Sequence, residues 1–302
     1  MLQLLINGLT LGSVYALIAL GYSMVYGILK LLNFAHGEVY MVGAFIGYGV
    51  LTAAGGPDAL ILPVWLVVIG MVVAAMLGSG VLGVVIERFA YRPLRNSPRI
   101  APLISALGVS FFLQASALLL FTARIRSYET PSFIDVGTGL DIGPARISLV
   151  RMLAIGMAVV LMVALTVLVR RTKLGRAMRA TAHDREAAAM MGVDVDRVIV
   201  ATFFIGSALA GAAGVMVGLV FGRIFHLMGF VAGLKGFTAA VVGGIGNIPG
   251  AMLGGLLIGL AEAFAAGYIS STFADLIVFA LLIMVMLLRP SGLLGTPAVD
   301  KV

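Results

Sequence analysis

The sequence predicts an all-α fold, a polytopic bundle of transmembrane helices, and three features of its composition support this class. Hydrophobic residues make up 61% of the 302 residues, whereas Asp, Glu, Lys and Arg together make up only 11%. Soluble domains carry about 25% charged residues, so this chain lacks the charges needed to cover a water-facing surface. The mean hydropathy is +1.14. The 39 glycines suit the close helix approach that packing inside a bilayer requires.

Apolar stretches long enough to span a bilayer follow one another along the chain. A spanning helix needs roughly 20 apolar residues, and nine stretches meet or approach this length: residues 4–29, 39–54, 59–86, 101–123, 147–169, 198–221, 228–248, 250–267 and 273–288. We therefore predict about eight to ten spans in one domain over residues 1–302. The seventh stretch is expected to be broken by Lys235 and a glycine-rich run. The first lacks the positive region of a signal peptide, which predicts a retained span.

Basic residues predict which loops face the cytoplasm. Lys and Arg in short loops stay on the cytoplasmic side of a membrane. Residues 87–99 contain four arginines, and residues 170–197 contain seven basic residues. Both loops are therefore predicted to be cytoplasmic, and the mixed-charge loop 124–146 between them is predicted to be external. With nine spans, the N-terminus lies outside and the C-terminus inside.

Two polar segments between apolar stretches, residues 30–38 and 233–250, indicate a transport pathway. Irregular backbone at membrane depth is tolerated only against protein or a water-filled cavity. Such interruptions in corresponding places of two halves of a chain point to a binding site. We predict that the pathway or its gate contains Asn33, His36, Glu38, Gly243, Gly244, Gly246, Asn247 and Pro249. The alternative is two unrelated loops near the interface, whose polar groups are solvated.

Acidic residues in the last spans are candidates for buried contacts rather than for catalysis. Glu262 is the best candidate for a buried polar contact, whereas Arg223, His226 and Asp275 are expected at interface level. The chain has no cysteine, only three scattered histidines and no GxxxxGK[ST] phosphate-binding loop. We therefore predict a transport protein with no catalytic residue, no metal site and no cofactor of its own.

The cytoplasmic segment that follows residue 172 is predicted to form a short amphipathic helix. Alanines and methionines alternate there with charged residues, and Gly192 stands in a C-cap position. A face of small side chains suits a groove in a partner protein. The alternative is a basic loop that only sets the topology.

The string EAAAMMG at residues 186–192 resembles the EAA signature of bacterial ABC importer permeases. The similarity extends to NFAHGEVYMVGAF (33–45), LGRAMRATAHDREAAAMMGVDVDRV (174–198), KGFTAAVVGGIGNIPGAMLGGLLIG (235–259) and LRPSGLLG (288–295). Over essentially the whole chain, these segments resemble a permease subunit of the high-affinity branched-chain amino acid ABC importers. The Ile-x-Leu-Pro ending of the general EAA pattern is absent here, so only the Glu-Ala-Ala and Gly positions transfer.

The resemblance implies one ABC-importer transmembrane permease domain over residues 1–302, in the bacterial cytoplasmic (inner) membrane, with a cytoplasmic coupling loop at 170–197. It implies a complex with a second related permease, two cytoplasmic ATP-binding subunits that hold ATP and Mg, and an extracytoplasmic substrate-binding protein. The transported solute would be a small amino acid. Contacts with an ATP-binding subunit would come from Arg176, Arg179, Arg185, Glu186, Ala187, Ala188 and Gly192.

Two other functions fit parts of the sequence. The same architecture is expected for permeases that import urea, short amides or a sugar. A secondary transporter or channel would explain the composition and the interrupted helices without an ATPase partner, but it leaves the EAA-like string without a role. The subunits that co-purify with this chain would discriminate among these functions.

Overall fold

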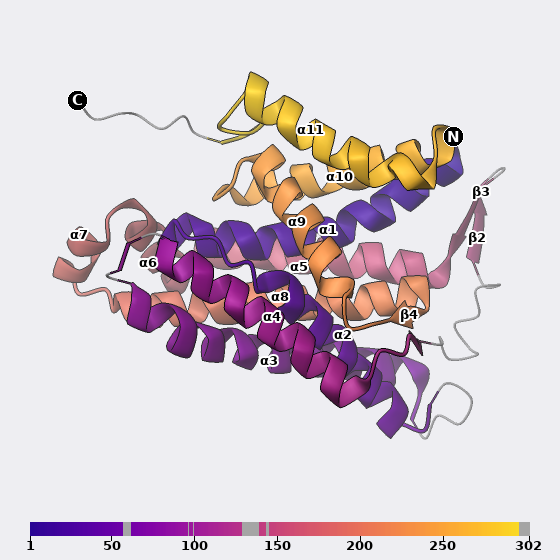
Figure 1. The fold of residues 1–302 in the computed structure, drawn as a ribbon, viewed down its shortest axis with the longest axis horizontal. Coiled ribbons are helices and arrows are strands. Elements are labelled where there is room, and N and C mark those ends of the chain that lie inside the picture. Colours follow the sequence, from indigo (N-terminus) through magenta and orange to yellow (C-terminus); the bar gives the residue numbers. More distant parts are fainter. Residues whose placement is uncertain (57–61, 96, 99, 129–138, 143–144, 296–302) are drawn as a thin grey trace.

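The computed structural model describes residues 1–56, 62–95, 97–98, 100–128, 139–142 and 145–295, and these form a helical bundle (Figure 1). Nine apolar helices occupy the positions of the nine predicted stretches: α1 (Leu2–Leu29), α2 (His36–Ala53), α3 (Val64–Ile86), α4 (Ile100–Phe121), α5 (Leu149–Arg171), α8 (Val195–Phe221), α9 (Met228–Gly243), α10 (Ile248–Tyr268) and α11 (Ala274–Leu288).

Seven helical segments within the described residues are long and apolar enough to cross a membrane, and α2 and α9 are the two that fall short. α9 has 16 residues, a length of about 24 Å, whereas the hydrocarbon core is about 30 Å thick. The expected break at Lys235 is wrong, because Lys235 lies inside the continuous helix α9. Its charge is paired with carboxylates of neighbouring helices. The chain turns instead at Gly244 and Gly246, which have φ values of 109° and 90°.

The two halves of the chain repeat the same packing. α1 packs on α9 and α10, and α8 packs on α2 and α3 in the same way. α1 and α8 run in opposite directions between the ends of the bundle (Figure 1). The non-helical residues 30–35 before α2 therefore correspond to residues 222–227 before α9. The sequence pairs segment 30–38 with segment 233–250 instead. The correspondence between residues 30–35 and 222–227 comes from the order and packing of the helices, and the two segments have little residue identity.

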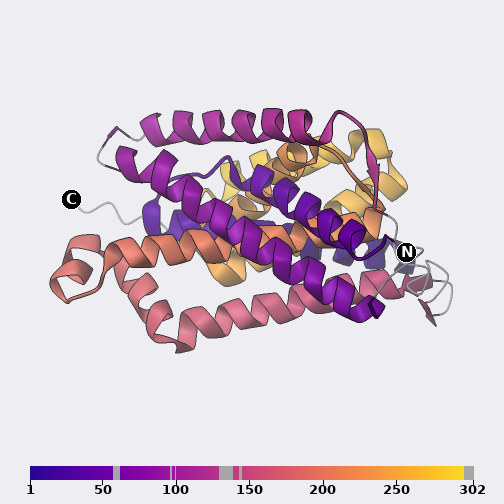
Figure 2. The same ribbon diagram turned by 90° about the horizontal axis from the view of Figure 1, so that it is seen from below.

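Glycines bring α1 and α10 into close contact. A Cβ atom added at Gly255 or Gly259 would overlap the backbone of α1 at Ala16 or Gly12. In a bilayer, helix association depends on such close packing because lipid tails are as apolar as the helix surfaces. α4 and α5 lie on opposite faces of the bundle, with α3 and α8 between them (Figure 2).

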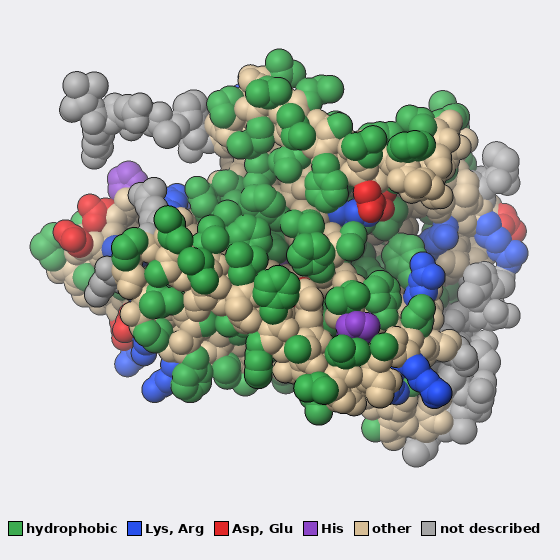
Figure 3. Space-filling model, viewed as in Figure 1, with side chains coloured by type: hydrophobic (Ala, Val, Ile, Leu, Met, Phe, Trp, Pro, Cys, Tyr) green, Lys and Arg blue, Asp and Glu red, His purple; other side chains and the backbone are tan. Residues whose placement is uncertain are grey.

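Most charged side chains on this face lie toward the two ends of the bundle, and apolar side chains cover much of the surface between them, where an acidic, a basic and a histidine side chain are also visible (Figure 3). At one end, α6 (Lys173–His183) and α7 (Arg185–Met190) form a helical hairpin between α5 and α8. At the other end, β2 (Gly139–Ile142) pairs with β3 (Ala145–Ser148), and β1 (Arg126–Ser127) pairs with β4 (Arg223–Ile224). The loops predicted to be cytoplasmic and external thus lie at opposite ends (Figure 1). Residues 129–138 and 143–144 of the external loop lie outside the described residues.

We expect this orientation to be readable by cysteine labelling, because the chain has no cysteine of its own. Leu140, 57% exposed on β2, and Met190, 81% exposed at the end of α7, are accessible positions. A Leu140→Cys variant should react with an impermeant maleimide in intact cells, and a Met190→Cys variant only after the membrane is permeabilised. Labelling of Met190→Cys in intact cells would reverse the orientation derived from the basic loops.

Candidate functional site: the cytoplasmic hairpin and the polar groups within the bundle

The α6–α7 hairpin, which the basic residues predict to be cytoplasmic, consists of two helices where the sequence predicts one. The Thr172 side chain accepts a hydrogen bond from the Gly175 N–H at 3.0 Å and starts α6. The Asp184 carboxylate accepts one from the Ala187 N–H at 3.0 Å and starts α7. Because Asp184 is an N-cap with extended backbone, it divides the predicted helix. Gly192 ends the hairpin with φ 83°, and the Val193 N–H donates to the Ala188 carbonyl, as the predicted C-cap requires.

The hairpin exposes two methionines where α7 ends. Met190 and Met191 are 81% and 84% exposed, whereas Ala188 is 5% exposed and packs inward. Of the other residues predicted to contact an ATPase, Arg185 and Ala187 are half-buried, and the remainder are exposed: Arg176, Arg179, Glu186 and Gly192. Two large apolar side chains at the tip of a polar hairpin suit a protein partner. Both methionines directly precede the C-cap glycine, Gly192, and lie next to the residues predicted to contact an ATP-binding subunit.

Two arginines tie the hairpin to the transmembrane helices. Arg185 Nη2 donates a hydrogen bond of 2.7 Å to the carbonyl of Ile28, in the last turn of α1. Arg179 Nη1 donates to the carbonyl of Val169, in the last turn of α5. The last carbonyls of a helix lack partners inside the helix, so both bonds satisfy free acceptors. Burial first, and then the charge of Arg95, lower the pKa of Arg185.

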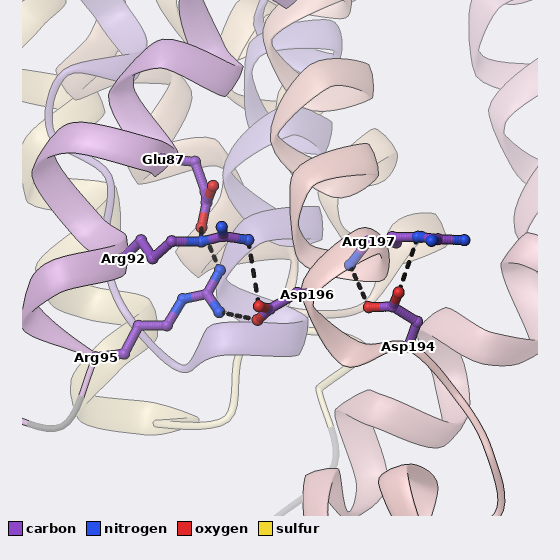
Figure 4. Close-up of polar contacts among 6 residues, drawn as sticks. All are labelled: Glu87, Arg92, Arg95, Asp194, Asp196 and Arg197. Carbon is purple, nitrogen blue, oxygen red and sulfur yellow. Dashed lines mark hydrogen bonds and ion pairs between the residues drawn. The ribbon is translucent and has the colours of Figure 1, made fainter.

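An ion-pair network joins the end of α3 to the start of α8, directly after the hairpin (Figure 4). Arg95 pairs with Glu87 and with Asp196, and Arg92 Nη2 lies 3.3 Å from Asp196 Oδ2. Glu87, in a π-helical turn at Glu87–Tyr91, is 1% exposed. Beside it, Asp194 caps α8 by accepting from the Arg197 N–H at 3.0 Å. The network therefore holds the end of α3 against the start of α8.

Removing the buried member of this network should cost more than removing the exposed one. The side chain of Arg95 is 16% exposed and that of Arg92 is 37% exposed. Arg95→Met leaves the buried Glu87 carboxylate with a weaker partner, so we expect a loss of about 3 kcal/mol in the free energy of unfolding. Arg92→Met should cost less than about 1 kcal/mol. Denaturant titration of the purified variants measures both, and equal losses would contradict this ranking.

Asn33, His36 and Glu38, predicted to lie in the pathway, are all at most 2% exposed in the interior of the bundle. Glu38 Oε1 accepts hydrogen bonds from Gln114 Nε2 at 2.7 Å and from Ser110 Oγ at 3.3 Å, both on α4. The Tyr91 hydroxyl donates to Asn33 Oδ1 at 3.3 Å. The His36 ring contacts the Tyr22 ring edge-on, with centroids 4.7 Å apart. α2 therefore begins inside the bundle, held by polar contacts to α1, α4 and the end of α3.

The glycine-rich segment lies elsewhere, at the cytoplasmic end. Gly246, Asn247 and Pro249 line a cavity of about 1200 Å³. Gly243 and Gly244 pack against the chain after α11, where the Leu294 N–H donates to the Gly243 carbonyl at 2.9 Å. Asn247 Oδ1 accepts from the Gly250 N–H and caps α10. Both parts of the predicted pathway contact α1, because the His36 ring meets the Tyr22 ring and the Gly246 N–H donates to Ser23 Oγ at 3.4 Å.

Glu262 belongs to a cluster of charged and polar groups from four helices. Glu262 Oε1 accepts from Lys235 Nζ at 2.8 Å, and Oε2 accepts from the Tyr15 hydroxyl at 2.9 Å. Lys235 Nζ also lies 2.7 Å from Asp275 Oδ1. The side chains of Lys235 and Glu262 are 8% and 14% exposed, and that of Asp275 is 55% exposed. Asp275, which is expected at interface level, lies in the first turn of α11 and shares Lys235 with Glu262 across three helices.

A bundle of spanning helices with a firmly anchored cytoplasmic hairpin and ionisable groups at membrane depth defines a multi-pass membrane transport protein. A model of the branched-chain amino acid transport system permease component matches residues 4–286. The chain belongs to this family.

Full-length relatives agree with this assignment. The chain is 46% identical over its whole length to the high-affinity branched-chain amino acid transport system permease protein LivH of Escherichia coli, covering 97% of that protein. It is also 46% identical to the permease protein BraD of the same kind of system in Pseudomonas aeruginosa, covering 98% of it. The fructose import permease protein FrcC of Rhizobium meliloti is 31% identical over 34% of this chain and 30% of its own length.

Proposed function

We propose that this chain is the membrane-spanning permease subunit of an ATP-driven, binding-protein-dependent ABC importer in a bacterial inner membrane, and that it translocates branched-chain or other small amino acids. The observation that carries this proposal is the 46% identity with LivH and BraD over the whole chain. The match to a fructose permease covers only a third of the chain. The amino acid is therefore favoured over a sugar as the solute.

In the proposed complex, this chain pairs with a second related permease, two cytoplasmic ATP-binding subunits and an extracytoplasmic binding protein. ATP and Mg are held by the ATP-binding subunits, and this chain holds neither. Its α6–α7 hairpin is tied to α1 and α5 by Arg185 and Arg179. The network around Glu87 ties α3 to α8. Displacement of the hairpin by an ATP-binding subunit would therefore move four spanning helices.

Reconstitution tests this proposal directly. Proteoliposomes that contain this chain, its co-purified permease and ATPase subunits and the binding protein should accumulate labelled leucine only with ATP and Mg. Excess unlabelled valine should compete, whereas urea, acetamide and fructose should not. Leucine uptake by this chain without ATPase subunits would instead establish a secondary transporter or a channel.

We keep Asn33, His36 and Glu38 as proposed residues of the pathway or its gate. An amino acid zwitterion brings two charges across the membrane, and each needs a polar partner during crossing. Within the described residues, Asn33 Nδ2 and Glu38 Oε2 are buried with no hydrogen-bond partner. Unpaired polar atoms at this depth are costly. A bound substrate, or a second conformation of the protein, that pairs these two atoms would remove that cost, and for this reason we assign them to the pathway.

Replacement of these polar groups should impair uptake more than folding. We expect Glu38→Leu to lower the rate of ATP-driven leucine uptake at least roughly tenfold, equivalent to about 1.4 kcal/mol. Thr202→Val is the matched control, because the Thr202 hydroxyl is equally buried and bonds only the Val198 carbonyl of its own helix. Uptake at the wild-type rate by Glu38→Leu would show that Glu38 serves packing alone.

A further inference from the structure

The cavity at the cytoplasmic end has a basic rim and an apolar interior. It lies between the end of α1, the ends of α5 and α6 and the segment that links α9 to α10, with a volume of about 1200 Å³. Lys30, Arg170 and Arg179 line it, and none of its described lining residues is acidic. All three cations are exposed, so they are solvated and free to meet a ligand. Apolar side chains complete the lining, among them Met24, Ile28, Met178 and Ile248.

These cations lack carboxylate partners within the described part of the chain. The ion pairs of the cytoplasmic end involve Arg92, Arg95 and Arg197 instead. Arg179 donates to one backbone carbonyl and retains further N–H donors for another acceptor. Lys30 caps α1 with φ 54°, in the left-handed region where glycine is favoured. A lysine therefore occupies a backbone position where glycine is the usual residue, and it lines the cavity.

We propose that this cavity binds a phosphate group, supplied by the headgroup of an anionic phospholipid of the cytoplasmic leaflet. Arg and Lys are the side chains that recognise phosphate oxygens, by forked hydrogen bonds and as a point charge respectively. Basic pockets between spanning helices on the cytoplasmic side suit lipid headgroups. The apolar interior beneath the rim accommodates acyl chains, which a free phosphate ion does not have.

The transported amino acid does not account for this charge. A zwitterion carries no net charge, so it would leave the positive charge of the three cations at the rim unbalanced. The same three cations would also repel its ammonium group. The lipid site shares Arg179, Gly246, Asn247 and Pro249 with the residues predicted for coupling and for the pathway. Lipid binding and amino acid uptake are measured separately, so either proposal can fail while the other holds.

Lipid binding can be measured on the full chain with its co-purified subunits in detergent, by native mass spectrometry at increasing phosphatidylglycerol. We expect Lys30→Gln and Arg170→Gln each to raise the Kd for phosphatidylglycerol roughly fivefold, and the double variant roughly thirtyfold. The matched control is the double variant Arg171→Gln, Lys173→Gln, which removes two neighbouring exposed cations that do not line the cavity. It should change the Kd less than about twofold, because salt screens the attraction between the lipid headgroup and exposed charges that do not line the cavity.

Further ligands and one uncharged variant sharpen the test. Phosphatidylcholine should bind much more weakly than phosphatidylglycerol, and glycerol 3-phosphate should bind more weakly still. Ala182→Phe, which fills the apolar part of the cavity without changing a charge, should also weaken phosphatidylglycerol binding. Equal loss of binding in both double variants, or phosphatidylcholine bound as tightly as phosphatidylglycerol, would overturn the proposal. Glycerol 3-phosphate bound as tightly as the lipid, with the same dependence on Lys30 and Arg170, would retain the phosphate site and replace its source by a soluble ester.

Discussion

Lys235→Met is expected to lower the free energy of unfolding by about 3 to 5 kcal/mol, the usual cost of removing one partner of a buried ion pair. Lys235 Nζ serves two carboxylates, Glu262 at 2.8 Å and Asp275 at 2.7 Å. Without the ammonium group, Glu262 keeps only the Tyr15 hydroxyl as a partner, in a site that is largely removed from water. An uncompensated carboxylate at membrane depth is among the costliest groups in a helical bundle.

A compensating substitution separates this explanation from a simple packing defect. The double variant Lys235→Met, Glu262→Gln removes both charges, so it should recover most of the stability that Lys235→Met loses. Asp275→Asn alone should cost much less, because its side chain is 55% exposed and is screened by its surroundings. Unfolding by denaturant in detergent micelles measures all three. A double variant no more stable than Lys235→Met would contradict the charge argument.

Changing Met190 and Met191 together to serine is expected to weaken association with an ATP-binding subunit at least roughly a hundredfold. Burial of a methionine side chain contributes about 1.5 to 3 kcal/mol, and two of them contribute enough for this change in Kd. Both side chains are more than four-fifths exposed in this chain, so their loss should leave its own stability unchanged. Co-purification and ATP hydrolysed per leucine transported are the two measurements.

Gly192→Val tests the shape of the same hairpin. A Cβ atom at Gly192 meets no neighbouring atom, but the residue has φ 83°, which a β-branched side chain rarely adopts. We expect this variant to insert normally and to hydrolyse ATP with reduced transport. Ala188→Trp should also impair α7, through overpacking inside this chain, because Ala188 is buried. Lys173→Gln is the control. If the methionine and glycine variants assembled normally and transported as much leucine per ATP as the wild type, the α6–α7 hairpin would not be the segment that couples ATP hydrolysis to transport.

Much of the fold can be predicted from the sequence, because a segment that crosses the bilayer must be long and apolar, and both properties are visible in a short stretch of residues. Runs of apolar residues predict the spans, and arginines in two loops predict the end at which the hairpin lies. The start of α7 was also readable in principle, since Asp184 has the residue type and position of an N-cap. The division at Asp184 was missed because a charged residue between amphipathic turns is equally typical of the polar face of one helix.

The sequence by itself determined the class of this protein and the positions of its spans, both of which depend on residues close together in the chain. Only the tertiary structure decided which polar groups meet. Glu38 bonds Gln114 across 76 positions, and Arg95 bonds Asp196 across 101. Such pairs depend on how helices of given length cross and rotate against one another, and no local pattern fixes those angles. The same limit explains why the sequence indicates a buried polar contact for Glu262 but does not identify Tyr15, 247 positions away, as one of its partners.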